Sequence, residues 1–106
     1  MKTNKEVLIQ ASEFLASIPD EKWQVGNYGI HGGRCCALGH LGLAERMPHD
    51  GDTMGDMRRT VKEAVADFLR VGLPTINDGR DPRFQQPTPK ARVLAALHEC
   101  ISKIKQ

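Results

Sequence analysis

Helical spacing of apolar residues runs through nearly all of this sequence. Near the N-terminus the apolar positions follow the i, i+3/i+4, i+7 rule: Val7, Leu8, Ala11, Phe14, Leu15 and Ile18. Thr3 and Glu6 form a capping-box pattern ahead of them, and Pro19 follows. Near the C-terminus Thr88 precedes Pro89, the usual order of an N-cap and a first helical residue. The apolar face after it consists of Val93, Leu94, Leu97, Ile101 and Ile104. We therefore predict amphipathic helices at both ends.

Two further helices are expected between them. One covers about 35–47, and the other has Asp52 or Thr53 as its cap and Gly72 just beyond its end. No segment shows clean period-2 alternation, and 23–28 is the sole, short strand candidate. The prediction is an all-α fold: a compact four-helix domain with two long ordered loops and at most one short strand or hairpin.

Length and charge limit the classes of protein that this chain can belong to. Its 106 residues fit a single helical domain, residues 1–106. The net charge of +2 argues against a general nucleic-acid binder, which carries a strong basic excess. No run of 18 apolar residues and no signal-peptide core occurs, so no membrane association is predicted. Three cysteines, of which Cys35 and Cys36 are adjacent, fit reduced thiols in a cytoplasm. A homo-oligomer is also considered, because a chain this small gains core by pairing.

The two predicted loops, 19–34 and 72–87, are longer than most connections in a compact domain. Their apolar and aromatic anchors are Trp23, Tyr28, Ile76 and Phe84. Loops of this length are usually functional when they are ordered. We expect ordered loops beside a site.

The densest motif is the Gly-rich run that leads into the second helix. Gly32, Gly33 and Arg34 stand directly before Cys35. If the helix starts at Cys35, free amides and the positive end of the helix dipole meet there, and Arg34 adds a bidentate grip on a phosphate or carboxylate. This is not a P-loop, because the G-x-x-x-x-G-K-[ST] pattern is absent. The alternative is that the glycines simply turn the chain and Arg34 is solvated.

Other chemistry is open to the same stretch. A cysteine at a helix N-terminus favours the thiolate, so Cys35 with His40 as base is the pair expected for a small cysteine hydrolase. Cys36 and His40 share a helix face, but the paired C-x-x-C spacing of zinc sites is missing. We predict no metal and no cofactor, and lean against an enzyme.

A second cluster lies in the later loop. Asn77 and Asp78 are typical turn residues, and Arg80 adds positive charge if this loop folds toward Arg34. Lys90 and Arg92 occupy the first turn of the last helix, where the dipole disfavours cations. That conflict hints at something anionic nearby.

The chain resembles an uncharacterised small helical domain family of bacterial and phage proteins. The residues that carry the likeness are the Trp-Gly loop (Trp23 to Gly26), the Cys-x-x-Gly helix start (Cys36 to Gly39), the Asn-Asp loop at Asn77, and the closing helix. His40 stands where that family usually has a small residue, and the Gly-Gly-Arg lead-in has no counterpart. No established activity comes with the resemblance, which implies a phage or phage-like origin.

These patterns together predict a non-enzymatic protein that binds an anionic, nucleotide-like small molecule. Trp23 or Tyr28 would stack on the ligand, while Arg34 and the amides of Gly33 and Cys35 would hold the anion. The remaining candidate ligand-binding residues are Gly32, His40, Asn77, Asp78 and Arg80. In a phage such a protein would sequester a host signalling nucleotide. The alternatives are an inhibitor that binds a host protein through an exposed face, and the cysteine hydrolase.

Overall fold

The computed structural model describes residues 3–26, 29, 35–43 and 51–104, although the side chains of 42–43 and 51–56 are not described. The chain is all-α, and its described part contains no strand. The elements are α1 (Asn4–Ala16), η1 (Asp20–Lys22), η2 (Gly39–Leu43), α2 (Gly51–Ala64), η3 (Val65–Leu69), α3 (Leu73–Asn77) and α4 (Pro89–Lys103). None of the described helices is long and apolar enough to cross a membrane.

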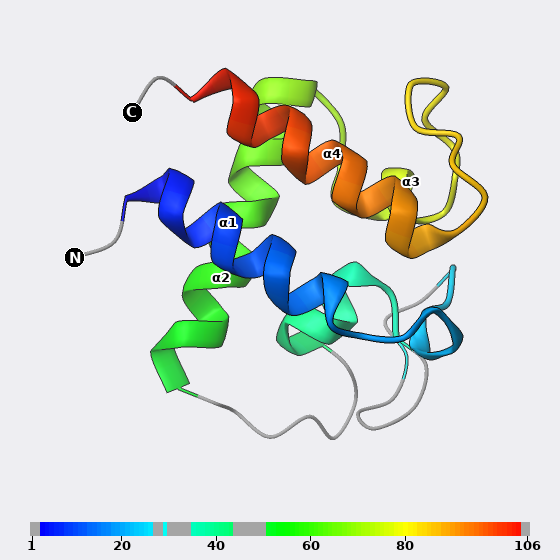
Figure 1. Ribbon diagram of the computed structural model, residues 1–106, viewed down its shortest axis with the longest axis horizontal. Coiled ribbons are helices and arrows are strands. Elements are labelled where there is room, and N and C mark those ends of the chain that lie inside the picture. The colour runs from blue at the N-terminus through cyan, green and yellow to red at the C-terminus, as the bar shows by residue number, and fades with distance from the viewer. Residues whose placement is uncertain (1–2, 27–28, 30–34, 44–50, 105–106) are drawn as a thin grey trace.

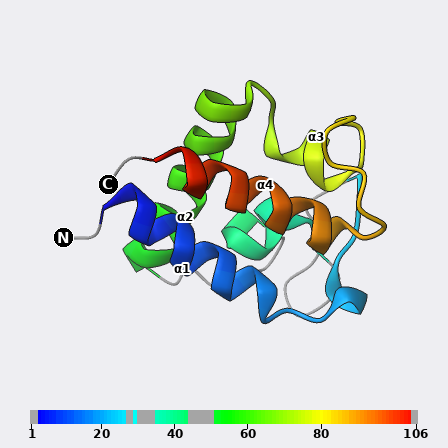
Figure 2. The ribbon, with the colours of Figure 1, turned by 45° about the horizontal axis from the view of Figure 1, so that its top comes forward.

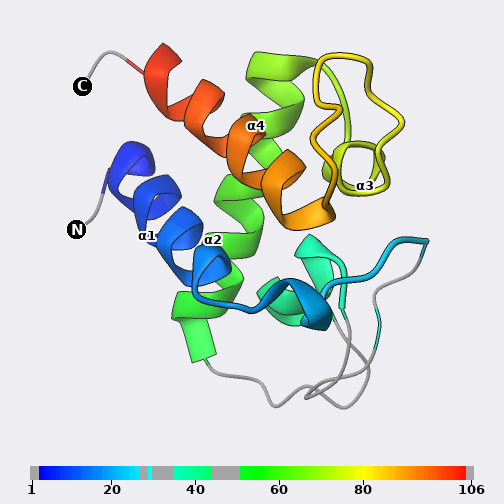
Figure 3. The ribbon, with the colours of Figure 1, turned by 45° about the vertical axis from the view of Figure 1, so that its right-hand side comes forward.

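The predicted first and last helices are confirmed, together with their caps. The Thr3 hydroxyl accepts a hydrogen bond from the Glu6 amide at 3.2 Å, and the Glu6 carboxylate accepts one from the Thr3 amide at 3.2 Å. At α4 the Thr88 hydroxyl accepts from the Ala91 amide at 3.1 Å. Both caps satisfy amides that the first helical turn leaves free. α1 and α4 lie side by side and antiparallel, and α2 crosses them (Figures 1, 2 and 3).

The third predicted helix is longer than α2 alone. From Gly51 the helix continues through the π-helical η3, so it begins just ahead of the expected cap. It ends at Arg70, which takes the left-handed conformation with φ 59°. The stop was expected at Gly72, since glycine usually fills such a position. Instead Gly72 is the N-cap of α3, a five-residue helix inside the predicted second loop.

The apolar faces of these helices enclose one core. Its fully buried large side chains include Leu8 and Leu15 of α1, Val61 of α2 and Leu97 of α4. Three of the predicted loop anchors also join it, because Trp23, Ile76 and Phe84 are buried. The fourth anchor, Tyr28, lies outside the described residues. Both connections are therefore anchored in the core by these three side chains.

Candidate functional site

Three segments far apart in the sequence meet at one corner of the molecule, which we call the junction: residues 23–26, 35–40 and 77–78. Two backbone hydrogen bonds join the first two. The Cys35 amide donates to the Lys22 carbonyl at 2.9 Å, and the Gln24 amide donates to the Cys35 carbonyl at 3.0 Å. Trp23 and Gly29 each form an isolated bridge with Cys35. Among its described residues, 23–26, the strand considered at 23–28 is present only as the Trp23 bridge.

Asn77 fastens the third segment to both of the others. Its side chain is fully buried. The Oδ1 atom accepts from the Ala37 amide at 3.0 Å, while Nδ2 donates to the Gln24 carbonyl at 2.9 Å and to Asp78 Oδ1 at 3.1 Å. Both amide protons and one acceptor site are thus used within the protein. Asn77 is the main polar tie of the junction.

Asp78 adds a hydrogen bond from the same loop to Gly26. Its Oδ1 accepts from the Gly26 amide at 3.0 Å as well as from Asn77. Gly26 has φ +94°, a conformation that side-chain-bearing residues rarely adopt. The carboxylate therefore secures a turn that depends on glycine, and its charge is offset by two N–H donors.

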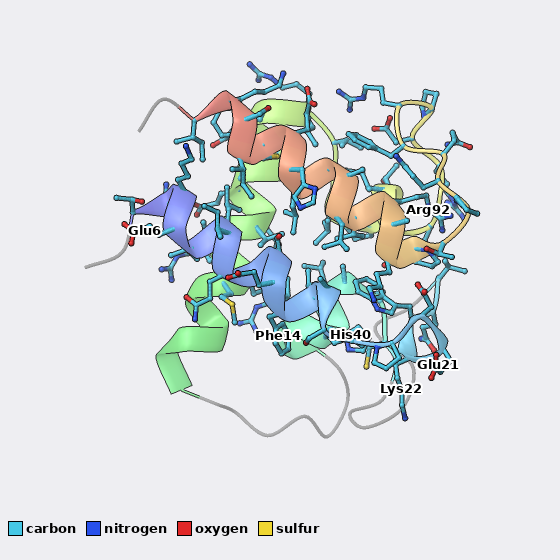
Figure 4. All side chains as sticks on the ribbon, viewed as in Figure 1. Glu6, Phe14, Glu21, Lys22, His40 and Arg92 are labelled. Atoms are coloured by element: carbon cyan, nitrogen blue, oxygen red, sulfur yellow. The ribbon has the colours of Figure 1, made fainter. Side chains whose placement is uncertain are left out.

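Trp23 and His40 pack against each other beneath this network. Their ring centroids lie 5.1 Å apart with the planes tilted by 57°. Trp23 Nε1 donates to the Ile18 carbonyl at 3.3 Å, and His40 Nε2 lies 2.8 Å from the Lys22 carbonyl. Because a carbonyl can only accept, His40 Nε2 carries a proton. Figure 4 shows His40 next to Lys22, beyond the C-terminal end of α1.

Burial determines what these two rings can do. Only 5% of Trp23 is exposed, so the indole has no open face on which a base can stack. Desolvation lowers the pKa of His40, although the carbonyls of Lys22 and Cys35 favour its charged form. The imidazole is therefore a neutral donor to the backbone rather than a cation aimed at an anion.

The predicted helix start at Cys35 is wrong by two residues, because helical geometry begins at Ala37. Cys35 is held in extended pairing, and its amide is already bonded to Lys22. The Ala37 amide, one of the free donors of the new helix, is bonded to Asn77. These two amides are thus committed to the protein itself. The other predicted anion-binding residues of this stretch, Gly32, Gly33 and Arg34, lie outside the described residues, as do residues 44–47 of the predicted helix.

Cys36 and Cys100 do not have the surroundings of nucleophiles. Cys35, Cys36 and Cys100 are free and buried. Desolvation raises the pKa of Cys36, and burial together with Glu99 raises the pKa of Cys100 to about 11. A catalytic thiol needs the opposite shift. The Cys36 sulfur accepts from the Gly39 amide at 3.5 Å, a contact within its own helical turn.

Arg80 and Arg83 of the later loop are both exposed, whereas Arg92 of α4 binds backbone carbonyls. Arg80 is exposed, as a ligand-binding cation would be. Arg92 donates to the carbonyls of Ile76 at 3.3 Å, Gln86 at 2.9 Å and Asn77 at 2.8 Å. Arg83 grips Asp81, with Nη2 2.8 Å from Oδ2, which lowers the pKa of that carboxyl.

Arg92 therefore corrects the inference that cations at the start of the last helix point to an anionic ligand. Its partners include the carbonyls at the C-terminal end of α3, which carry partial negative charge. Figure 4 shows Arg92 at the N-terminal end of α4, close to α3. The sequence did not predict α3, so these carbonyl partners of Arg92 were not foreseen.

Within the described part of the chain, no three or more His, Cys, Asp or Glu side chains are grouped closely enough to hold a metal ion. The chain matches none of the family models, curated proteins or solved structures with which it was compared.

Proposed function

We propose that this chain is a non-enzymatic binding protein for a phosphate-bearing, nucleotide-like small molecule, held beside the junction by Arg34 and Arg80. The observation that carries the proposal is the pair of ties from Asn77 to Gln24 and from Asp78 to Gly26. They bring the loop that continues to Arg80 against the segment that continues to the Gly-Gly-Arg run. The described residues on either side of the Gly-Gly-Arg run, Gln24, Gly26 and Ala37, are thus bonded to the segment that leads to Arg80.

The junction supports binding through rigidity rather than through direct contact. Its polar side chains are bonded to the backbone, which fixes the bases of both loops before a ligand arrives. Preorganisation of this kind reduces the ordering cost of binding. Stacking on the ligand is assigned to Tyr28, since Trp23 is buried. The phage origin, the sequestration of a host nucleotide and the homo-oligomer stay predictions.

Binding is favoured over catalysis by the state of the thiols. Cys36 and Cys100 have raised pKa values, and His40 directs Nε2 at a carbonyl. A protein-interaction face stays the second prediction. The exposed apolar side chains Ile9 (39%), Val25 (50%) and Phe68 (36%) come from three different segments.

Thermal unfolding with adenosine and guanosine mono-, di- and triphosphates tests the proposal, with the nucleosides as controls that lack phosphate. A nucleotide at 100 times its Kd should stabilise the fold by about 2.7 kcal/mol, a shift of roughly 10 °C in Tm. The nucleotide should be recovered unchanged. Arg34→Ala and Arg80→Ala should each reduce the shift, while Lys62→Ala, an exposed cation of α2, should retain it. If no phosphate compound at millimolar concentration raises the Tm of the wild-type chain, the proposal is wrong.

A further inference from the structure

The chain turns sharply as it leaves α3, between Asp78 and Arg80. The Gly79 amide donates to the Ile76 carbonyl at 3.1 Å. The Arg80 amide donates to the Thr75 carbonyl at 3.0 Å, which completes the pair of hydrogen bonds of a Schellman helix end. Gly79 has φ +76°, a conformation that side-chain-bearing residues rarely adopt. This turn fixes the backbone that carries Asp78 and Arg80.

Arg92 of α4 holds the same turn from another side. A Cβ atom at Gly79 would lie 3.2 Å from Cζ of Arg92, so the guanidinium covers the glycine closely. That guanidinium also donates to the carbonyls of Ile76 and Asn77. The turn is therefore fixed by the protein itself, and a ligand that binds to it does not have to order its backbone.

Asp78 has one carboxylate oxygen engaged and one open. Its Oδ1 accepts from the Gly26 amide at 3.0 Å and from Asn77 Nδ2 at 3.1 Å. Its Oδ2 has no hydrogen-bond partner among the described residues, and the side chain is only partly buried. An ionised carboxylate can only accept hydrogen bonds. Oδ2 is thus a fixed acceptor at the edge of the junction, open to an N–H or O–H donor.

Arg80 provides the opposite charge close by. It follows Asp78 by two residues, which separates their backbones by at most about 7 Å. The two side chains do not form an ion pair with each other, and Arg80 is exposed. A guanidinium binds phosphate through two parallel N–H groups. One rigid turn therefore presents an acceptor and a phosphate-binding cation within a short distance.

Starting from the proposed function, we propose that this turn selects a ribonucleotide over a 2′-deoxyribonucleotide, with Arg80 on the phosphate and Asp78 Oδ2 accepting from the 2′-hydroxyl of the ribose. The carboxylate repels the phosphate, so it faces a part of the ligand that carries a donor. The sugar is bonded directly to the phosphate, whereas the base lies beyond the sugar. The short spacing of the two residues therefore matches the ribose, whose 2′-hydroxyl supplies the O–H donor.

Calorimetric titration with GMP and 2′-deoxy-GMP, and with AMP and 2′-deoxy-AMP, tests this assignment. We expect the wild-type chain to bind each ribonucleotide about tenfold more tightly, the lower end of what a hydrogen bond to a charged group contributes. Asp78→Asn keeps an acceptor for the Gly26 amide but removes the charge, and should reduce the preference to about twofold. Asp20→Asn, an exposed carboxylate of η1, is the matched control and should keep the full preference. Arg80→Ala should weaken both members of each pair by the same factor.

Equal affinity of the wild-type chain for GMP and 2′-deoxy-GMP would overturn the selection of ribose and leave the proposed function standing. An undiminished preference in the folded Asp78→Asn variant would overturn the role of Asp78. 3′-Deoxy-GMP should bind as tightly as GMP, and weaker binding would contradict the contact with the 2′-hydroxyl. The two deoxy nucleotides decide the question on the wild-type chain even if Asp78→Asn does not fold. If neither GMP nor AMP binds, the proposed function falls together with the selection of ribose.

Discussion

Replacement of Asn77 by alanine should destabilise the fold more than loss of any exposed side chain. The substitution removes the acceptor of the Ala37 amide and the donor to the Gln24 carbonyl. The hydrogen bond to Ala37 is buried and the one to Gln24 is partly buried. Water therefore replaces the lost partners poorly, above all at Ala37.

The expected cost follows from these two groups. A buried polar group left without a partner costs about 1–3 kcal/mol. We assign about 2 kcal/mol to the Ala37 amide and about 1 kcal/mol to the Gln24 carbonyl, a total of about 3 kcal/mol. Domains of this size are stable by about 5–15 kcal/mol, so the loss is a large fraction. The corresponding fall in Tm is roughly 10–15 °C.

Urea unfolding followed by Trp23 fluorescence measures this free energy, since Trp23 is the sole tryptophan and packs at the junction. Asn4→Ala removes an exposed amide and should change the free energy of unfolding by less than about 0.5 kcal/mol. Asn77→Asp keeps the acceptor for Ala37 but turns a carboxylate toward the Gln24 carbonyl and Asp78. It should be at least as destabilising as alanine at pH 7. A loss below about 1 kcal/mol in Asn77→Ala would refute the role of this side chain as the tie of the junction.

Three other features give measurable expectations. Arg92→Lys should cost about 2 kcal/mol in urea unfolding, because one ammonium cannot reach three carbonyls, whereas Lys90→Ala should cost little; equal losses would contradict the assignment. Burial lowers the folded-state pKa of His40, so the unfolded chain takes up the proton first as the pH falls below about 6.5. Stability is therefore full above that pH and declines toward the lowered pKa, and His40→Gln should flatten this part of the unfolding curve against pH. Cys36 and Cys100 should react with a thiol reagent at pH 8 at least tenfold more slowly in the folded chain than in urea, and rapid labelling of either thiol in the native chain would contradict their burial.

The helices at both ends were predictable because their signals are local. Thr3 with Glu6, and Thr88 with Pro89, act within one turn of the chain, and the structure has both caps. The end of η3 was misplaced because Arg70, rather than a glycine, adopts the left-handed conformation. The helix α3 was missed because five residues are too few to show a helical period.

The junction was predictable only in part. The sequence singled out Trp23, Cys35, His40, Asn77 and Asp78, and the structure brings all five together. Their predicted contact with a ligand is a different matter, because Trp23, Cys35 and His40 are buried and Asn77 is bonded to the backbone. Sequence motifs identified residues that lie together in the structure. Whether such a residue can contact a ligand depends on its burial, which the motifs do not reveal.

The hydrogen bonds of Asn77 also bear on the order in which the chain folds. They join positions 40 and 53 residues apart, so they form only after two long loops have closed. Formation of the single helices α1 and α4 needs only local contacts. We expect the amide to be unformed at the folding barrier, so its loss accelerates unfolding and leaves the folding rate nearly unchanged. The tie that fixes the base of both loops thus governs how long the native junction persists rather than how fast it is reached.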